Sequence, residues 1–204
     1  MTLPSDSELQ SIVRRVVKRT ISATLNASLA GEGKQIGARP PRGVAAPLPE
    51  RDPAPPEGIV ALGADHGGFQ LKEIIKKHLE EKGYTLIDCG THGTQSVDYP
   101  DFARVVAVLV GEGKAWRGIM IDGAGIGSCM VANKLPGVRA SMCYDHATAH
   151  NAREHNDANV LTLGAGLIGV NLAKQIVDTW LTTPFAGGRH ARRVEKIVAL
   201  DPPP

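Results

Sequence analysis

Hydrophobic and polar positions divide the 204-residue chain into three zones. In the first, apolar residues recur at three- and four-residue spacing, which predicts one amphipathic helix within residues 1–29. This apolar stripe consists of Leu9, Ile12, Val13, Val16, Val17, Ile21 and Leu25. Because a single helix of this length is marginally stable in water, we expect its stripe to bind a partner surface.

The second zone, residues 30–57, is rich in proline and glycine and poor in large apolar side chains. Half of the chain's 14 prolines lie there. Such a segment buries too little apolar surface to form a core, so we expect a semi-extended linker.

In the third zone, residues 58–204, short apolar runs alternate with helical patterns. The runs are residues 59–63, 85–89, 118–122, 138–143 and 159–163. The helical patterns cover residues 68–82, 100–112, 126–135, 145–155, 167–181 and 189–199. This alternation predicts an α/β domain with a doubly wound parallel sheet and helices on both faces. In such domains, ligands bind beyond the carboxyl ends of the strands.

Composition narrows the classes of function. Hydrophobic residues make up 42% of the chain and charged residues 22%, which is typical of a folded soluble protein. The net charge of +2 and the aromatic content of 4% disfavour a nucleic-acid partner. Cys89, Cys129 and Cys143 form no CxxC pair, so we expect a reducing, cytoplasmic setting and no structural zinc site. No apolar run is long enough to span a membrane.

Two turns after predicted strands carry candidate chemistry. After the first strand, Asp65 and His66 either face the ligand crevice or serve as a helix cap and a surface polar residue, and both interpretations stay open. After the third strand, a glycine-rich loop runs from Asp122 to Ser128. Its backbone N–H groups form a candidate nest for a phosphate or an enediolate oxygen, contributed by Gly123, Ala124, Gly125 and Gly127. A dinucleotide fingerprint follows the first strand instead, so a nicotinamide site is disfavoured.

Basic residues near the C-terminus are candidates for proton transfer and phosphate binding. Histidine is a common acid/base in proteins, so His155 is a candidate acid/base, although a histidine also suits a helix end for structural reasons. Arg189 and Arg193 share one helix face at i and i+4, where together they would hold a phosphate. Their place at the start of a helix opposes the helix dipole, which weakens a purely structural interpretation.

Taken together, these motifs resemble the ribose-5-phosphate isomerase B family, which also includes the galactose-6-phosphate isomerase subunits. The resemblance spans residues 59–197 almost continuously. It is carried by residues 63–69, 96–100, 131–134, 153–159 and 187–190. It implies a Rossmann-like three-layer domain with a five-stranded parallel sheet, in a homodimer or homotetramer with active sites between subunits. It also implies no metal and no organic cofactor.

The same resemblance implies an aldose–ketose isomerase that converts ribose 5-phosphate to ribulose 5-phosphate through an enediolate. By motif, Asp65 and His66 contact the sugar phosphate and Tyr99 lines the pocket. His155 is the acid/base for ring opening, with Asn156 beside it. Phosphate contacts come from the neighbouring chain, through Arg189, His190 and Arg193.

Several positions depart from the family pattern. Asp122 stands where many members have a cysteine base, Ala124 replaces a hydroxyl residue, and Gly166 replaces an arginine. Some relatives place a glutamate base where this chain has Ser128. We therefore assign catalysis to Asp122, His155 and Asp65, with Asp122 as the replacement base. Alternatively, Asp122 only caps the glycine loop, and the chain binds a sugar phosphate without turnover or isomerises another pentose or hexose.

The N-terminal zone lies outside the resemblance. A short amphipathic helix on a flexible linker resembles the encapsulation peptides of bacterial microcompartment cargo. It would bind a shell or cargo protein through residues 5–25. Binding to an anionic membrane surface, docking on the enzyme itself and oligomerisation are the alternatives.

Overall fold

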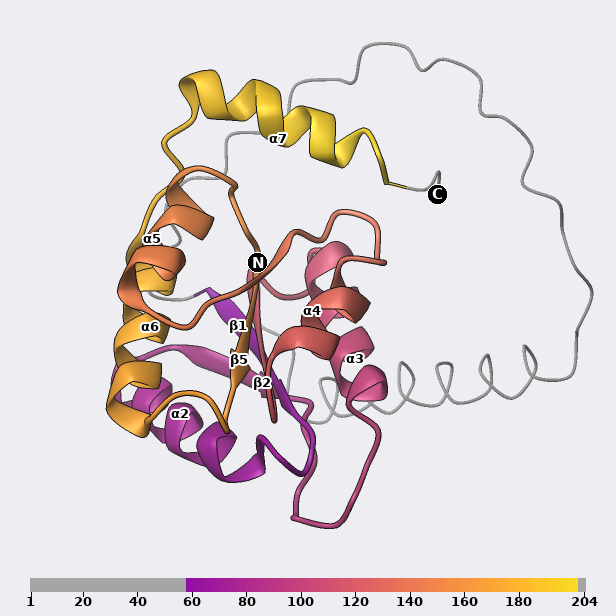
Figure 1. The fold of residues 1–204 in the computed structure, drawn as a ribbon, viewed down its shortest axis with the longest axis vertical. Helices are drawn as coiled ribbons and strands as arrows, with labels where there is room; N and C mark the ends of the chain where they lie inside the picture. The colour runs from indigo at the N-terminus through magenta and orange to yellow at the C-terminus, as the bar shows by residue number, and fades with distance from the viewer. Residues whose placement is uncertain (1–57, 202–204) are drawn as a thin grey trace, which may run out of the picture. The chain divides into compact units, whose positions relative to one another are not determined.

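The computed structural model describes residues 58–201, so the predicted helix of residues 1–29 and the linker of residues 30–57 lie outside the described residues. Strands and helices alternate along the described chain (Figure 1). In order they are β1 (Ile59–Ala64), α2 (Phe69–Glu81), β2 (Thr85–Asp88), α3 (Tyr99–Gly111), β3 (Arg117–Asp122), α4 (Ile126–Ala132), β4 (Ala140–Met142), α5 (His146–Glu154), β5 (Val160–Gly164), α6 (Val170–Thr182), the 3₁₀ turn η1 (Gly188–His190) and α7 (Ala191–Val198).

The strands form one parallel sheet in the order β2-β1-β3-β5-β4, which confirms the predicted α/β fold. Helices α3 and α4 pack on one face, and α2, α5 and α6 pack on the other. Because both faces are covered, β3 and β5 are buried along their whole length. This explains why they were recognisable as uninterrupted apolar runs.

Helix α4 and strand β4 are both shorter than the sequence pattern predicted: the helix ends at Ala132 instead of residue 135, and the strand begins at Ala140 instead of residue 138. Asn133 ends α4, because its amide donates to the carbonyl of Cys129 (3.1 Å) and accepts from the N–H of Ala140 (2.9 Å). Ahead of β4, Arg139 donates its N–H to the Asn159 side chain instead of to a strand neighbour (2.7 Å). Side-chain amides thus replace backbone hydrogen bonds at both ends of this connection.

The main core lies between the sheet and helices α2, α5 and α6. Trp180 of α6 is fully buried there. Arg117 at the start of β3 donates to the carbonyls of Trp180 (2.6 Å) and Leu181 (3.3 Å), which ties the end of α6 to the sheet. None of the helices within residues 58–201 is both long and apolar enough to cross a membrane.

Candidate active site

Strands β1, β3 and β5 are neighbours and parallel, so their carboxyl ends meet at one edge of the sheet, which we call the carboxyl edge. Ala64 pairs with Ile121, and Asp122 pairs with Gly164. Asp65 also donates its N–H to the Ile121 carbonyl (3.3 Å). Asp65 and Asp122 therefore leave adjacent strand ends at the same level.

The Asp122 carboxylate organises the glycine loop that follows it. Its Oδ1 accepts from the N–H groups of Ala124 (2.8 Å) and Gly125, and its Oδ2 accepts from the N–H (3.2 Å) and hydroxyl of Ser128. Gly125 has φ = 77°, a conformation that favours glycine. Thr162 of β5 fixes the loop from below by donating to the Gly125 carbonyl (2.8 Å).

The N–H nest differs from the one that the glycine spacing predicted. The N–H groups of Ala124 and Gly125 are used internally by Asp122. Those of Gly123, Ile126 and Gly127 have no acceptor within residues 58–201. The N–H groups of Gly123, Ile126 and Gly127 are therefore the donors left for a ligand.

Asp65 lies against this loop. Its Oδ1 accepts the N–H of Gly68 (2.9 Å) and so holds the turn into α2. A Cβ placed on Gly67 would lie 3.4 Å from Asp65 Oδ1 and 3.4 Å from the Gly123 nitrogen. The turn after β1 and the glycine loop after β3 are therefore in direct contact.

His66 and Tyr99 close the same region. His66 Nδ1 lies 3.2 Å from the carbonyl oxygen and 3.3 Å from the nitrogen of Val97, which ties the turn after β1 to the segment that leads into α3. The Tyr99 ring lies over Gly127, so close that a Cβ there would be 2.5 Å from the ring. Asp65, His66, Tyr99, Asp122 and the loop thus lie together at the carboxyl edge, and we call them one half-site.

The remaining predicted residues lie elsewhere. His155 caps the C-terminal end of α5, and strand β5 begins shortly afterwards at Val160. It therefore sits at the amino edge of the sheet, where β5 begins. With five residues in β5, the two edges are about 13 Å apart along the strand. Figure 1 shows the C-terminal end of α5 and helix α7 at one end of the domain, and the connections from β1 to α2 and from β5 to α6 at the other.

At the amino edge, the rings of His155 and His190 stack with centroids 4.2 Å apart and planes 3° apart. Asn151 donates its amide N–H to His155 Nδ1 (2.9 Å). Since that nitrogen acts as the acceptor, neutral His155 carries its proton on Nε2, which lies 3.2 Å from the Glu154 carboxylate. Arg189 lies beside the pair, with its Nε 3.3 Å from His190 Nε2.

The pKa of His190 is lowered from its ordinary value of 6.5. Burial is the largest cause, and the positive charges of His155, Arg189 and Arg193 act in the same direction. Arg189, Arg193 and Asn156 are exposed. This second half-site is therefore basic and open to solvent.

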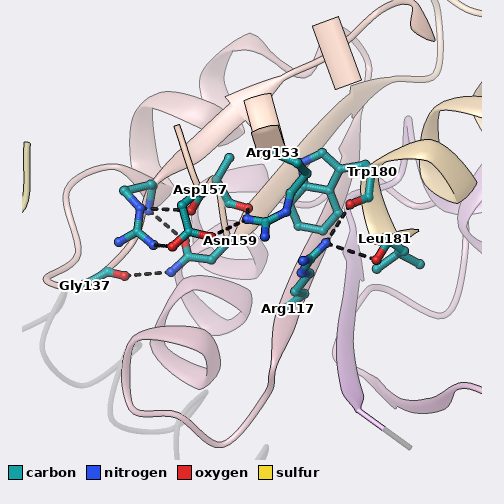
Figure 2. A network of polar contacts seen from close by, with 9 residues as sticks. Arg117, Gly137, Arg153, Asp157, Asn159, Trp180 and Leu181 are labelled. Atoms are coloured by element: carbon teal, nitrogen blue, oxygen red, sulfur yellow. Dashed lines mark hydrogen bonds and ion pairs between the residues drawn. The ribbon is translucent and has the colours of Figure 1, made fainter. Parts of the chain in front are cut away.

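A network of ion pairs holds the second half-site in place (Figure 2). Asp157 has φ = 46°. Its carboxylate forms ion pairs with the guanidinium groups of Arg153 (N–O distance 2.8 Å) and Arg139 (2.7 Å). Arg153 also donates to the Ala158 carbonyl (2.5 Å), and Asn159 donates to the Gly137 carbonyl (2.8 Å). The motif of residues 153–159 thus has buried anchoring residues at its two ends, residues 153, 158 and 159, and residues that reach solvent between them.

The sequence pattern alone did not separate the buried anchoring residues of this motif from the residues that reach solvent. It treated residues 153–159 as one functional motif and gave no role to Arg139, Arg153 or Asp157. It also did not place His155 on the opposite edge from Asp122. One signal was available: His155 precedes a predicted strand, whereas Asp65 and Asp122 each follow one.

The cysteines are packing residues: Cys89 and Cys143 are buried and Cys129 is partly buried. Burial raises the pKa of Cys143 to about 11 and that of Cys89 to about 12. Burial also raises the pKa of Cys129, whose thiol donates to the Ala140 carbonyl (3.5 Å). None of these thiols is suited to take a proton from carbon near neutral pH. Within residues 58–201, no three His, Cys, Asp or Glu side chains are grouped to hold a metal ion.

Comparison with known proteins places this geometry in a family. The Ribose/Galactose Isomerase family matches residues 60–197. Ribose-5-phosphate isomerase B of Escherichia coli is 46% identical over 142 residues, which cover 70% of this chain and 95% of the relative. D-erythrulose-4-phosphate isomerase of Pectobacterium atrosepticum is 45% identical over 139 residues, covering 68% of this chain and 91% of the relative.

Solved structures agree. Ribose-5-phosphate isomerase B of Clostridium thermocellum superposes with a TM-score of 0.69 at 51% identity, covering 70% of this chain and 96% of that structure. The Mycoplasma genitalium enzyme with bound ribulose-5-phosphate superposes with a TM-score of 0.67 at 40% identity, covering 69% and 94%. The chain therefore belongs to the Ribose/Galactose Isomerase family and is an aldose–ketose isomerase.

Proposed function

We propose that this protein interconverts ribose 5-phosphate and ribulose 5-phosphate. Relatives that carry this name match at 46% and 51% identity over nearly their whole length. The observation that carries the proposal is the carboxyl-edge half-site, where a partly free carboxylate faces a loop with unused N–H groups.

The reaction needs four kinds of group. An acid/base must open the sugar ring, a base must move a proton between two carbons, donors must stabilise the enediolate oxygen, and cations must hold the phosphate. His155 serves ring opening, and the N–H groups of Gly123, Ile126 and Gly127 serve the enediolate. Arg189, His190 and Arg193 hold the phosphate, with Asn156 beside them. A carboxylate at the carboxyl edge moves the proton.

These groups act together only if two copies of the chain share a site. Within one chain, His155 and the arginines lie at the amino edge, and Asp65 and Asp122 lie at the carboxyl edge. Large apolar side chains lie exposed around the carboxyl-edge half-site: Ile126 (49%), Met130 (64%), Tyr144 (54%) and Leu167 (61%). A second copy would bury this surface and bring its amino edge to the glycine loop.

Mixing inactive variants tests the shared site. Asp65→Asn and His155→Ala would each be inactive alone. If sites are shared, each mixed dimer contains one site without a mutation, and an equal mixture recovers about a quarter of wild-type activity. If each chain holds a whole site, the mixture stays inactive.

A panel of phosphorylated sugars tests the reaction itself. We expect turnover with ribose 5-phosphate to exceed turnover with erythrulose 4-phosphate, galactose 6-phosphate and other hexose phosphates. The second candidate function is isomerisation of a different phosphorylated sugar. Two observations favour it: Ala124 and Gly166 depart from the family pattern, and one relative is named for erythrulose 4-phosphate. Binding of all sugars without turnover would instead indicate a sugar-phosphate sensor.

The N-terminal zone carries a separate proposal. We propose that residues 1–29 direct the enzyme to a bacterial microcompartment, on the strength of their amphipathic pattern and the linker that follows. Deleting residues 1–30 should leave isomerase activity intact and abolish co-purification with shell proteins. A truncated enzyme that still co-purifies with shells would contradict this role.

A further inference from the structure

The two carboxylates at the carboxyl edge have different hydrogen-bonding environments. A carboxylate has about four acceptor positions, two on each oxygen. All four positions of Asp122 are filled by its own loop: two N–H groups at Oδ1, and the N–H and hydroxyl of Ser128 at Oδ2. Asp122 therefore has no lone pair left for a substrate proton unless the loop opens.

Asp65 is bound on one oxygen only. Oδ1 accepts the Gly68 N–H (2.9 Å), whereas Oδ2 has no hydrogen-bond donor within residues 58–201. Nδ1 of the His66 ring lies 4.0 Å from Oδ2, beyond hydrogen-bonding distance. The Asp65 side chain is 9% exposed, so it is largely dehydrated yet still open to a ligand.

Its location fits the reaction. Asp65 and Asp122 leave adjacent strand ends, and the turn of Asp65 contacts the loop at Gly123, whose N–H is unused. An open-chain sugar whose oxygen met that N–H would bring its first carbons toward the free oxygen of Asp65.

We infer that Asp65, and not Asp122, is the base that moves the proton between the two carbons, an inference that rests on the proposed function. Asp65 Oδ2 takes the proton from C2, and the electrons of the broken C–H bond form the C1–C2 double bond of the enediolate. The proton then returns from Asp65 to C1, while the O2 hydroxyl proton moves to O1, so no other reactant is needed. Asp122 is a positioning residue that fixes the loop donors.

Two isosteric variants separate the roles. Asp65→Asn keeps an oxygen for the Gly68 N–H and removes only the basic oxygen. Asp122→Asn keeps an oxygen for Ala124 and Gly125, and its amide can donate to the Ser128 hydroxyl, while only the bond from the Ser128 N–H is lost. With ribose 5-phosphate, Asp65→Asn should lower kcat by about 10²–10⁴-fold and Asp122→Asn by about tenfold.

Proton exchange gives the decisive measurement. In D₂O, Asp122→Asn should still incorporate deuterium into the sugar, as followed by NMR, whereas Asp65→Asn should bind the sugar phosphate without incorporating it. Added formate should restore part of the activity of Asp65→Ala and none to Asp122→Ala. An Asp122→Asn protein that binds sugar phosphate but incorporates no deuterium would overturn the inference, as would an Asp65→Asn protein with more than about a tenth of wild-type kcat. A wild-type protein without isomerase activity would fault the proposed function instead.

Discussion

The carboxyl edge and the amino edge of the sheet hold their polar groups in different ways. At the carboxyl edge, Asp122 is satisfied by backbone N–H groups and one hydroxyl group within six residues of itself. At the amino edge, two of the buried contacts join residues distant in sequence: Arg139 and Asp157 are 18 residues apart, and Arg117 and Trp180 are 63 apart. The hydrogen bonds of Asp122 are thus local, whereas those of Arg139 and Arg117 join separate segments of the chain.

This difference separates stability from chemistry. A local loop keeps its form as long as its own residues are present, so changes there should act mainly on the reaction. A buried ion network is destabilised when one partner is removed, because the other charge stays buried and loses part of its compensation. Four predictions test this contrast, in order of decreasing effect.

Replacing Asp157 should produce the largest loss of stability. Arg153 and Arg139, whose side chains are only 6% and 11% exposed, both pair with Asp157. Asp157→Ala should lower the free energy of unfolding by about 3–5 kcal/mol, as measured by urea denaturation. The exposed helix residue Glu80 provides the control, and Glu80→Ala should change the free energy of unfolding by less than about 0.5 kcal/mol. Equal effects of the two variants would contradict the network's role.

Replacing Arg193 should affect the reaction and leave stability unchanged. Arg193→Ala should raise KM for the phosphorylated sugar by about 10–100-fold, because a charged hydrogen bond contributes about 1.5–3 kcal/mol. Arg192, its exposed neighbour on α7, is the matched control. Steady-state kinetics in which Arg192→Ala and Arg193→Ala behave alike would remove Arg193 from the phosphate site.

Enlarging Gly127 should perturb the carboxyl edge alone. A methyl group there lies 2.5 Å from the Tyr99 ring, which is 38% exposed and can swing away. Gly127→Ala should therefore lower kcat/KM about tenfold with little change in melting temperature. Gly169→Ala, where a methyl group meets no atom within 4 Å, should change neither. In a double-mutant cycle, Tyr99→Ala should remove most of the effect of Gly127→Ala; additive losses would show that the ring is not involved.

Acidification should weaken the amino edge slightly. The lowered pKa of His190 means that, just below pH 6.5, the unfolded chain binds a proton that the folded protein does not. The stability that comes from this histidine is thus fully present above pH 6.5 and is lost as the pH falls from 6.5 through the folded-state pKa. Between pH 7.5 and pH 5.5, the urea midpoint of His190→Gln should decrease less than that of the wild type. The exposed His92 serves as control, and His92→Gln should keep the wild-type decrease.

Much of the fold was predictable from local pattern. The runs at β1, β3 and β5 were recognisable because strands buried on both faces are continuously apolar. Among the strands, the least accurate boundary was the start of β4, where the side chains of Asn133 and Asn159 replace backbone partners. Such substitutions depend on residues brought together only by folding, so no local window contains them.

For the site, the sequence by itself determined which chemical groups are present and which turns carry them, because glycines, carboxylates and strand ends act within a few residues. Tertiary structure decided how those groups are used. It brought the turn of Asp65 against the glycine loop at Gly123, and it set His155 against His190 at the far edge. Those outcomes follow from distances between separate segments, and such distances exist only once the sheet has formed.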